Sequence, residues 1–195
     1  MYSSTAAYYL DKAFAFQQGL EIGNLRTIAL SEAEYLTGIG FRFNGEYDKE
    51  FSGNETVYLL YEVTGTDWAV ALQSRSFKSR DGSAEIDVLW NSTGYTAGTP
   101  EPSFNQNGLH SSRSSALSFS VIAPPTVEGI MRETDFLSSS GAGNNSSGDL
   151  STGSGSRIYA PGQSFILKVT NLENSVNRIH INYDWADLHI SLFTQ

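Results

Sequence analysis

The chain has 195 residues, of which 12 are basic and 21 acidic, with no cysteine and a formal net charge of −9 at pH 7. The length suits one all-β domain, with or without a tail. The lack of cysteine excludes disulfides, thiolate metal sites and a cysteine nucleophile, and the negative charge disfavours nucleic acid and anionic lipid as partners. With no apparent secretory signal and no apolar run of about 18 residues, we expect a soluble protein without a membrane span.

The first 25 residues are poorly patterned for a strand and rich in aromatic side chains. Residues 8–16 fit either a short helix or an extended arm. Five aromatic residues crowd this segment: Tyr2, Tyr8, Tyr9, Phe14 and Phe16. Because tyrosine and phenylalanine are enriched at binding surfaces, we predict that this arm (residues 1–25) contacts a partner. The alternative is that the arm packs back on its own domain.

Residues 26–195 are predicted to form one β-domain. Weak strand candidates at 27–30 and 39–43 flank a possible helical turn at 31–35. Val57–Val63 is apolar on both faces, which indicates either a central strand covered by a second layer or a strand that meets a partner. Residues 68–72 follow a turn-like Gly65-Thr66-Asp67, so the two strands are expected to form a hairpin.

The remaining strands are predicted from apolar residues at every second position. These segments are Ala84–Trp90, Leu117–Val121, residues 165–169, Asn177–Trp185 and a final strand at 188–192. The total of about eight to ten strands, without long helices, favours an antiparallel sandwich or a barrel.

Residues 138–156 interrupt this pattern. They are nearly all Gly, Ser, Asn and Thr. Such a composition buries too little apolar surface to offset the entropy of ordering. We therefore expect a long exposed loop between two strands, mobile in the isolated protein.

Catalytic motifs are not evident, and we do not expect an enzyme. No serine lies in a Gly-x-Ser-x-Gly elbow, and no glycine-rich phosphate loop precedes a helix. All three tryptophans fall on apolar strand faces, so we assign them to the core rather than to a sugar-binding platform.

The best metal candidate is the polar face of the predicted strand at Asn177–Trp185. His180 and Asp184 share this face, and Asp187 and His189 lie beyond an expected turn. Two histidines and two carboxylates could converge on zinc or iron. The competing interpretation, a solvated strand face, is preferred because spacing alone does not define three ligands. We expect no metal and no other cofactor.

Three stretches resemble capsid decoration proteins, also called cement or head proteins, of tailed bacteriophages. The first is AEIDVLWNSTGYTAGTPEPSFNQN (84–107), the second is Ala123–Leu137, and the third is Gly162–Asp187. Together they span much of the C-terminal two-thirds of the chain. The sequence departs from the family pattern near Asn105–Asn107, where an arginine is expected after the second asparagine.

This resemblance implies a jelly-roll-like β-sandwich with a structural role in the virion. The implied function is to bind and stabilise the outside of the capsid, after assembly in the host cytoplasm, with the major capsid protein as partner. A homo-oligomer is also expected, with a trimer as one arrangement. The alternative function is a receptor- or carbohydrate-binding module of a phage tail or fibre, because β-sandwiches serve both roles.

Overall fold

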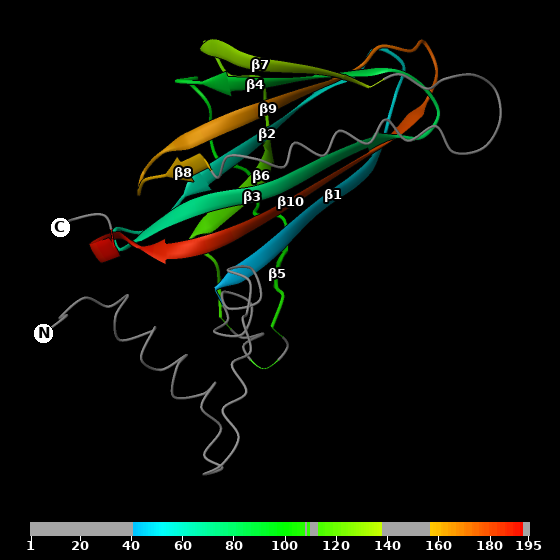
Figure 1. Cartoon of the computed structure of the whole chain (residues 1–195). Coiled ribbons are helices and arrows are strands. Elements are labelled where there is room, and N and C mark those ends of the chain that lie inside the picture. The colour runs from blue at the N-terminus through cyan, green and yellow to red at the C-terminus, as the bar shows by residue number, and fades with distance from the viewer. Residues whose placement is uncertain (1–40, 108, 110–112, 138–156, 193–195) are drawn as a thin grey trace, which may run out of the picture.

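The computed structural model of the chain describes residues 41–107, 109, 113–137 and 157–192 (Figure 1). The arm 1–25, the candidate elements at 27–30 and 31–35, and the Gly/Ser-rich segment 138–156 lie outside the described residues. The described residues form ten β-strands and a short 3-10 helix: β1 Arg42–Phe51, β2 Thr56–Val63, β3 Trp68–Ser79, β4 Ala84–Trp90, β5 Ser103–Asn105, β6 Leu117–Ile122, β7 Ile130–Leu137, β8 Arg157–Tyr159, β9 Ser164–Asn171, β10 Asn177–His189 and η2 Ile190–Leu192.

The strands form two antiparallel sheets that pack face to face (Figure 1). Sheet A has the order β5-β1-β10-β3-β8, and sheet B has the order β6-β2-β9-β4-β7. The pairing is nested, because β1 pairs with β10, β2 with β9, β3 with β8 and β4 with β7. β5 and β6 add to the edges beside β1 and β2. The predicted antiparallel β-sandwich is confirmed.

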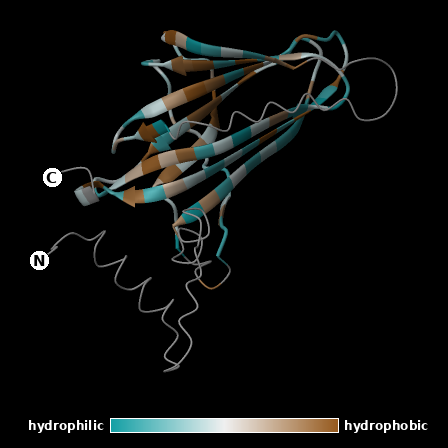
Figure 2. Cartoon of the chain, in the orientation of Figure 1, coloured by the Kyte–Doolittle hydropathy of each residue, from teal (hydrophilic) through white to brown (hydrophobic). Residues whose placement is uncertain are grey.

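The space between the sheets is filled by buried apolar side chains. Figure 2 shows hydrophobic and hydrophilic residues alternating along most strands. Trp185 is fully buried, and the ring of Tyr61 stacks on Phe119 and Phe165 with centroid separations of 5.3 and 4.8 Å. At Gly45 a Cβ atom would lie 2.8 Å from Phe119 and 2.9 Å from Trp185. Glycine in β1 therefore makes room for these large rings.

The outer face of sheet B carries a second apolar cluster that the chain itself covers. Its buried members are Tyr58, Leu60, Leu89, Ile122 and Ile166. Tyr95, from the connection after β4, packs against this cluster, and the hydroxyl of Tyr58 donates to Glu128 Oε1 at 2.5 Å. Glu128 belongs to the connection after β6, and the Thr93–Val127 bridge joins the two connections. The two-faced character of Val57–Val63 thus reflects a central strand beneath a second layer.

The predicted hairpin between residues 57–63 and 68–72 is wrong. β2 lies in sheet B between β6 and β9, whereas β3 lies in sheet A between β10 and β8. The turn-like Gly65-Thr66-Asp67 carries the chain from one sheet to the other. A short polar turn specifies a reversal of direction but does not specify that the two strands pair.

The predicted final strand at 188–192 is also wrong. β10 continues without a turn through Asp187 to His189, and residues 190–192 form the helix η2. The long strand finds partners over its full length, since β1 pairs with residues 177–186 and β3 pairs with residues 179–189.

Candidate functional site

The five aromatic residues predicted to contact a partner, Tyr2, Tyr8, Tyr9, Phe14 and Phe16, lie outside the described residues. Their role stays a prediction. The first described residue, Phe41, packs against Trp68 of β3 at a centroid distance of 5.0 Å, and it clusters with Ala186. The guanidinium of Arg113 lies over both rings, 3.8 Å from Phe41 and 4.7 Å from Trp68. An apolar patch capped by a cation therefore marks the point where residues 1–40 join the sandwich.

The tryptophans do not all occupy the same environment. Trp185 lies in the main core, and Trp90 packs against that core from a half-buried position. Trp68 instead lies in the separate cluster with Phe41 at the start of β3, where the ring of His189 meets it edge-on at 5.1 Å. The assignment of tryptophans to a single core is therefore too simple for Trp68.

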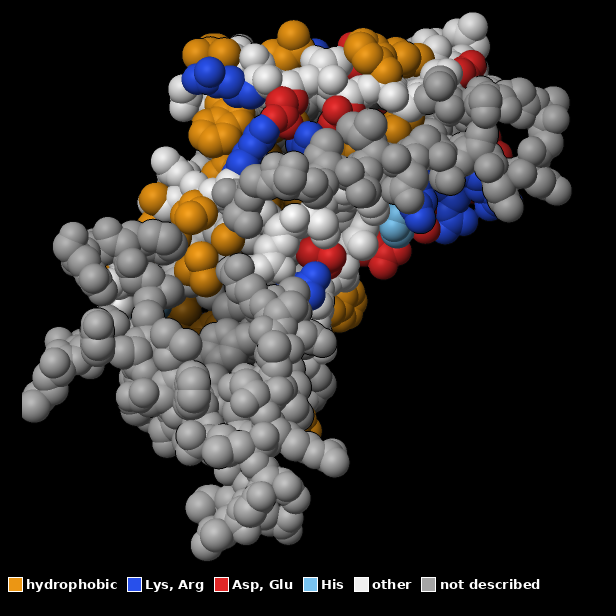
Figure 3. All heavy atoms as spheres, in the orientation of Figure 1, with side chains coloured by type: hydrophobic (Ala, Val, Ile, Leu, Met, Phe, Trp, Pro, Cys, Tyr) orange, Lys and Arg blue, Asp and Glu red, His pale blue; other side chains and the backbone are white. Residues whose placement is uncertain are grey.

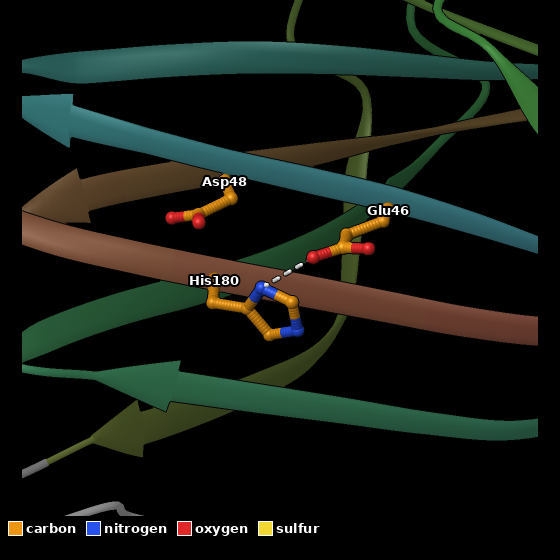
Figure 4. A group of neighbouring side chains, drawn as sticks. All are labelled: Glu46, Asp48 and His180. Atoms are coloured by element: carbon orange, nitrogen blue, oxygen red, sulfur yellow. Dashed lines mark ion pairs between the residues drawn. The ribbon is translucent and has the colours of Figure 1, made fainter.

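The outer face of sheet A brings one histidine to two carboxylates. Glu46, Asp48 and His180 offer ligand atoms within 4.8 Å of one another (Figure 4). His180 Nδ1 lies 3.3 Å from Glu46 Oε1. Asp48 accepts two hydrogen bonds from Arg178, at 2.8 and 2.7 Å, and these bonds lower the pKa of its carboxyl group. Because Asp48 is already engaged by a guanidinium, the group is better described as a surface ion-pair cluster than as a metal centre.

The four residues considered as metal ligands, His180, Asp184, Asp187 and His189, are not brought together. Asp184 lies on the same face as His180 but has its own partners: Ser74 and Gln106 donate to it at 2.8 and 2.9 Å, and Asn44 donates at 3.3 Å. Arg42 approaches it to 3.7 Å. Asp184 is the centre of a polar network rather than a free ligand.

The other two members of that set point elsewhere. His189 lies beside Trp68 and is 2.9 Å from the hydroxyl of Ser191. Asp187 faces the interior and is only 2% exposed. It accepts hydrogen bonds from the backbone of Ala116 at 2.8 Å and from Ser115 at 3.1 Å, and burial raises its pKa to about 6. Asp187 thus anchors the chain that leads into β6.

Sequence reasoning missed Glu46 and Asp48. The register of the β1–β10 ladder places Asp48 opposite His180, and Glu46 opposite Asn182. These strands are far apart in the chain, and no local spacing indicates which strand lies beside residues 177–189. The alternation of Glu46, Asp48 and Glu50 with larger residues is a signal for a strand, but not for its partner.

Exposed apolar side chains gather on the edge strand β7. Ile130, Met131 and Phe136 are 52%, 58% and 66% exposed. The neighbouring Glu133 and Asp135 are each paired with Arg75, at 2.8 and 3.2 Å. Charged residues of this kind and the bulge in the β4–β7 ladder are devices that protect an edge from pairing with another strand. The edge is apolar in part, yet poorly suited to strand addition.

No helix among the described residues is both long and apolar enough to cross a membrane. Comparisons with protein-family models, with curated proteins and with solved structures found no match to the chain, so the residues and the fold alone support what is proposed below.

Proposed function

We propose that the chain is a non-enzymatic structural protein of a phage virion, which decorates the outside of the capsid by binding the major capsid protein. The observation that carries this proposal is the nested strand order. In eight of the strands, β1 to β4 and β7 to β10, each strand pairs with its counterpart from the other end of the series, and the pairs alternate between sheets. We infer a jelly roll with β5 and β6 added at its edges, an architecture used by viral capsid domains and lectins.

Because jelly rolls occur in both capsid domains and lectins, the fold alone does not choose between capsid binding and glycan binding. The aromatic arm is the feature that favours capsid binding. Part of each broad face of the described sandwich is occupied by the chain's own contacts: the polar network around Asp184 on sheet A and the covered cluster on sheet B. An arm that carries five aromatic residues supplies the kind of anchors that dominate protein interfaces. A homo-oligomer on the capsid surface, including a trimer, agrees with this role.

The test is co-sedimentation with undecorated capsids of the phage whose genome encodes the chain. One variant replaces Tyr2, Tyr8, Tyr9, Phe14 and Phe16 with alanine. A matched control replaces five polar residues of the same segment, Ser3, Ser4, Asp11, Gln17 and Gln18, with alanine. Because burial of one such ring contributes about 1.5–3 kcal/mol, we expect the aromatic variant to lose affinity by orders of magnitude and the control to bind as the parent does.

Circular dichroism and thermal melting of both variants separate binding from folding. A variant that keeps the β spectrum but decorates capsids normally would place the contacts on the sandwich. A full-length protein that ignores capsids would refute the proposal.

A second candidate function is a carbohydrate- or receptor-binding module of a tail or fibre. The outer face of sheet A favours it, because Asn44, Asn182 and Gln106 line this face beside Phe104, which is 57% exposed. Exposed aromatics next to amides are typical of glycan sites. Binding on a glycan array, lost in Phe104→Ala and retained in Val176→Ala, would support this function; Val176 is equally exposed in the β9–β10 turn.

A further inference from the structure

A cleft of about 260 Å³ opens where the edges of the two sheets meet, and it is lined by Trp90, Arg132, Glu133 and Arg157. Arg132 and Glu133 come from β7, Arg157 from β8 and Trp90 from the end of β4. Among the described residues no ladder joins β7 to β8, and ion pairs of Glu133 with Arg75 and Arg157 bridge this edge of the sandwich. Figure 3 shows basic, acidic and apolar side chains gathered together in this region, below β7.

Two of the lining residues have hydrogen-bond donors that are not used. Arg132 is exposed and makes no ion pair or hydrogen bond within the described part of the chain. The indole Nε1 of Trp90 is buried, and no described residue accepts its hydrogen bond. A buried N–H without an acceptor is costly, so this donor is a place where a ligand atom gains free energy.

The two carboxylates at this edge are, by contrast, already in ion pairs with arginines. Glu133 forms ion pairs with Arg75 at 2.8 Å and with Arg157, and Asp135 pairs with Arg75 at 3.2 Å. Three arginines therefore face two carboxylates, which leaves one positive charge at this edge in a chain whose net charge is −9. A ligand that fits must supply acceptors and negative charge.

We propose that this cleft binds the carboxylate group of a small ligand. The planar guanidinium of Arg132 matches a carboxylate in a two-point contact, and Trp90 Nε1 donates to a further oxygen of the ligand. The volume of about 260 Å³ lies just below the usual range of about 300–1,000 Å³ for ligand pockets, which suits an acidic monosaccharide or one acidic side chain and excludes a large cofactor. The inference goes beyond capsid binding and does not depend on it.

The experiment uses the isolated full-length protein and three probes: glucuronate, N-acetylglutamate and neutral glucose. Binding is followed by the indole N–H signals of the three tryptophans in ¹H–¹⁵N spectra, with Trp90 assigned from the variant Trp90→Phe. We expect saturable binding of at least one carboxylate, with a shift of the Trp90 signal, and no response to glucose.

Arg132→Gln removes the guanidinium that would make the two-point contact. We expect it to weaken carboxylate binding about tenfold or more, because hydrogen bonds between charged groups are stronger than those between neutral groups. Trp90→Phe keeps an aromatic ring but removes the N–H donor, so we expect carboxylate binding to weaken about threefold to tenfold. Calorimetry measures this affinity. The matched control is Arg80→Gln, because Arg80 is an exposed arginine in the turn after β3. It should bind as the parent does.

Glucuronate binding without N-acetylglutamate binding assigns the cleft to acidic sugars, and the reverse assigns it to acidic side chains of a protein. The proposal is overturned if neither carboxylate saturates, if glucose binds equally well, or if Arg80→Gln weakens binding as much as Arg132→Gln. None of these readouts involves capsids, so failure here and failure of the decoration role are separate results.

Discussion

The outer faces of the two sheets differ in the kind of side chain that they carry and in how those side chains are shielded from or exposed to water. On sheet A the outward side chains are polar and satisfy one another, with Asp184 accepting from Ser74, Gln106 and Asn44. On sheet B the outward side chains of the central strands are apolar, and the connections after β4 and β6 fold over them. Sheet B therefore lies between two apolar layers, whereas sheet A has its main core on one side only. The contrast predicts where the sandwich is fragile.

The largest effect is expected for Leu60→Ala, on the outer face of sheet B. Leu60 is 1% exposed, and its truncation should leave a cavity beneath the covering connections. We expect a loss of about 2–5 kcal/mol in the free energy of unfolding, measured by urea denaturation. Ser76→Ala, at a half-buried outward position of sheet A, is the control and should change stability by less than about 0.5 kcal/mol. Equal effects at both positions would show that the covering layer adds no second core.

The next effect concerns pH and the carboxyl group buried in sheet A. Burial raises the pKa of Asp187 from 3.8 to about 6, so the folded protein holds this proton more tightly than the unfolded chain does. The protonated Asp187 therefore contributes its full stabilisation of the folded state below the unfolded pKa of 3.8, and this contribution is lost as the pH rises through about 6. A shift of this size corresponds to roughly 2–3 kcal/mol.

Urea melts of the parent and of Asp187→Asn between pH 4 and pH 8 provide the measurement, because the asparagine variant lacks this titration. The parent should lose stability relative to the variant as the pH rises. Parallel curves would mean that Asp187 titrates alike in the folded and unfolded states.

A smaller effect is expected for Asp184→Ala, which removes the centre of the polar network on sheet A. Its donors, Ser74, Gln106 and Asn44, are near the surface and can turn to water, so we expect a loss of about 1–2 kcal/mol. Thermal melting measures it. A loss as large as that of Leu60→Ala would show that the polar face contributes as much as the covered one.

The smallest effect is expected for Tyr58→Phe, which keeps the ring in the cluster of sheet B but deletes the hydrogen bond to Glu128. Glu128 is also held by Lys168 at 3.0 Å, so the connection after β6 stays in place. We expect a loss of about 0.5–1 kcal/mol. Faster hydrogen exchange confined to residues 123–129 would identify the part of the cover that loosens, and faster exchange in β10 would argue against this local role.

The sequence predicted strands well where one face is apolar and the other polar. β4 begins and ends where the alternation does, at Ala84 and Trp90. β1 was largely missed because Gly45 and Lys49 interrupt its apolar face, and Gly45 is needed to admit Trp185. β7 was missed because its alternating positions at Glu133 and Asp135 are charged and not apolar. Both carboxylates pair with Arg75 of the opposite sheet.

The candidate sites were harder to predict than the strands. His180 was recognised, but its neighbours Glu46 and Asp48 depend on the β1–β10 register, which links residues more than a hundred positions apart. The cleft beside Trp90 likewise could not be predicted, because it forms where β4, β7 and β8 come together. Local patterns carry the period of a strand, whereas the identity of its neighbour depends on the packing of the whole domain.

The nested pairing of β1 with β10 and of β2 with β9 has a consequence for biosynthesis. A ribosome delivers β1 more than a hundred residues before β10, so β1 waits for its main ladder partner until nearly the whole chain has emerged. Loops that long are slow to close, and proteins rich in such pairings fold on the millisecond-to-second scale. During that wait the apolar faces of the early strands are exposed to other chains. We therefore expect aggregation to occur during synthesis at high expression levels, and not through unfolding of the finished sandwich.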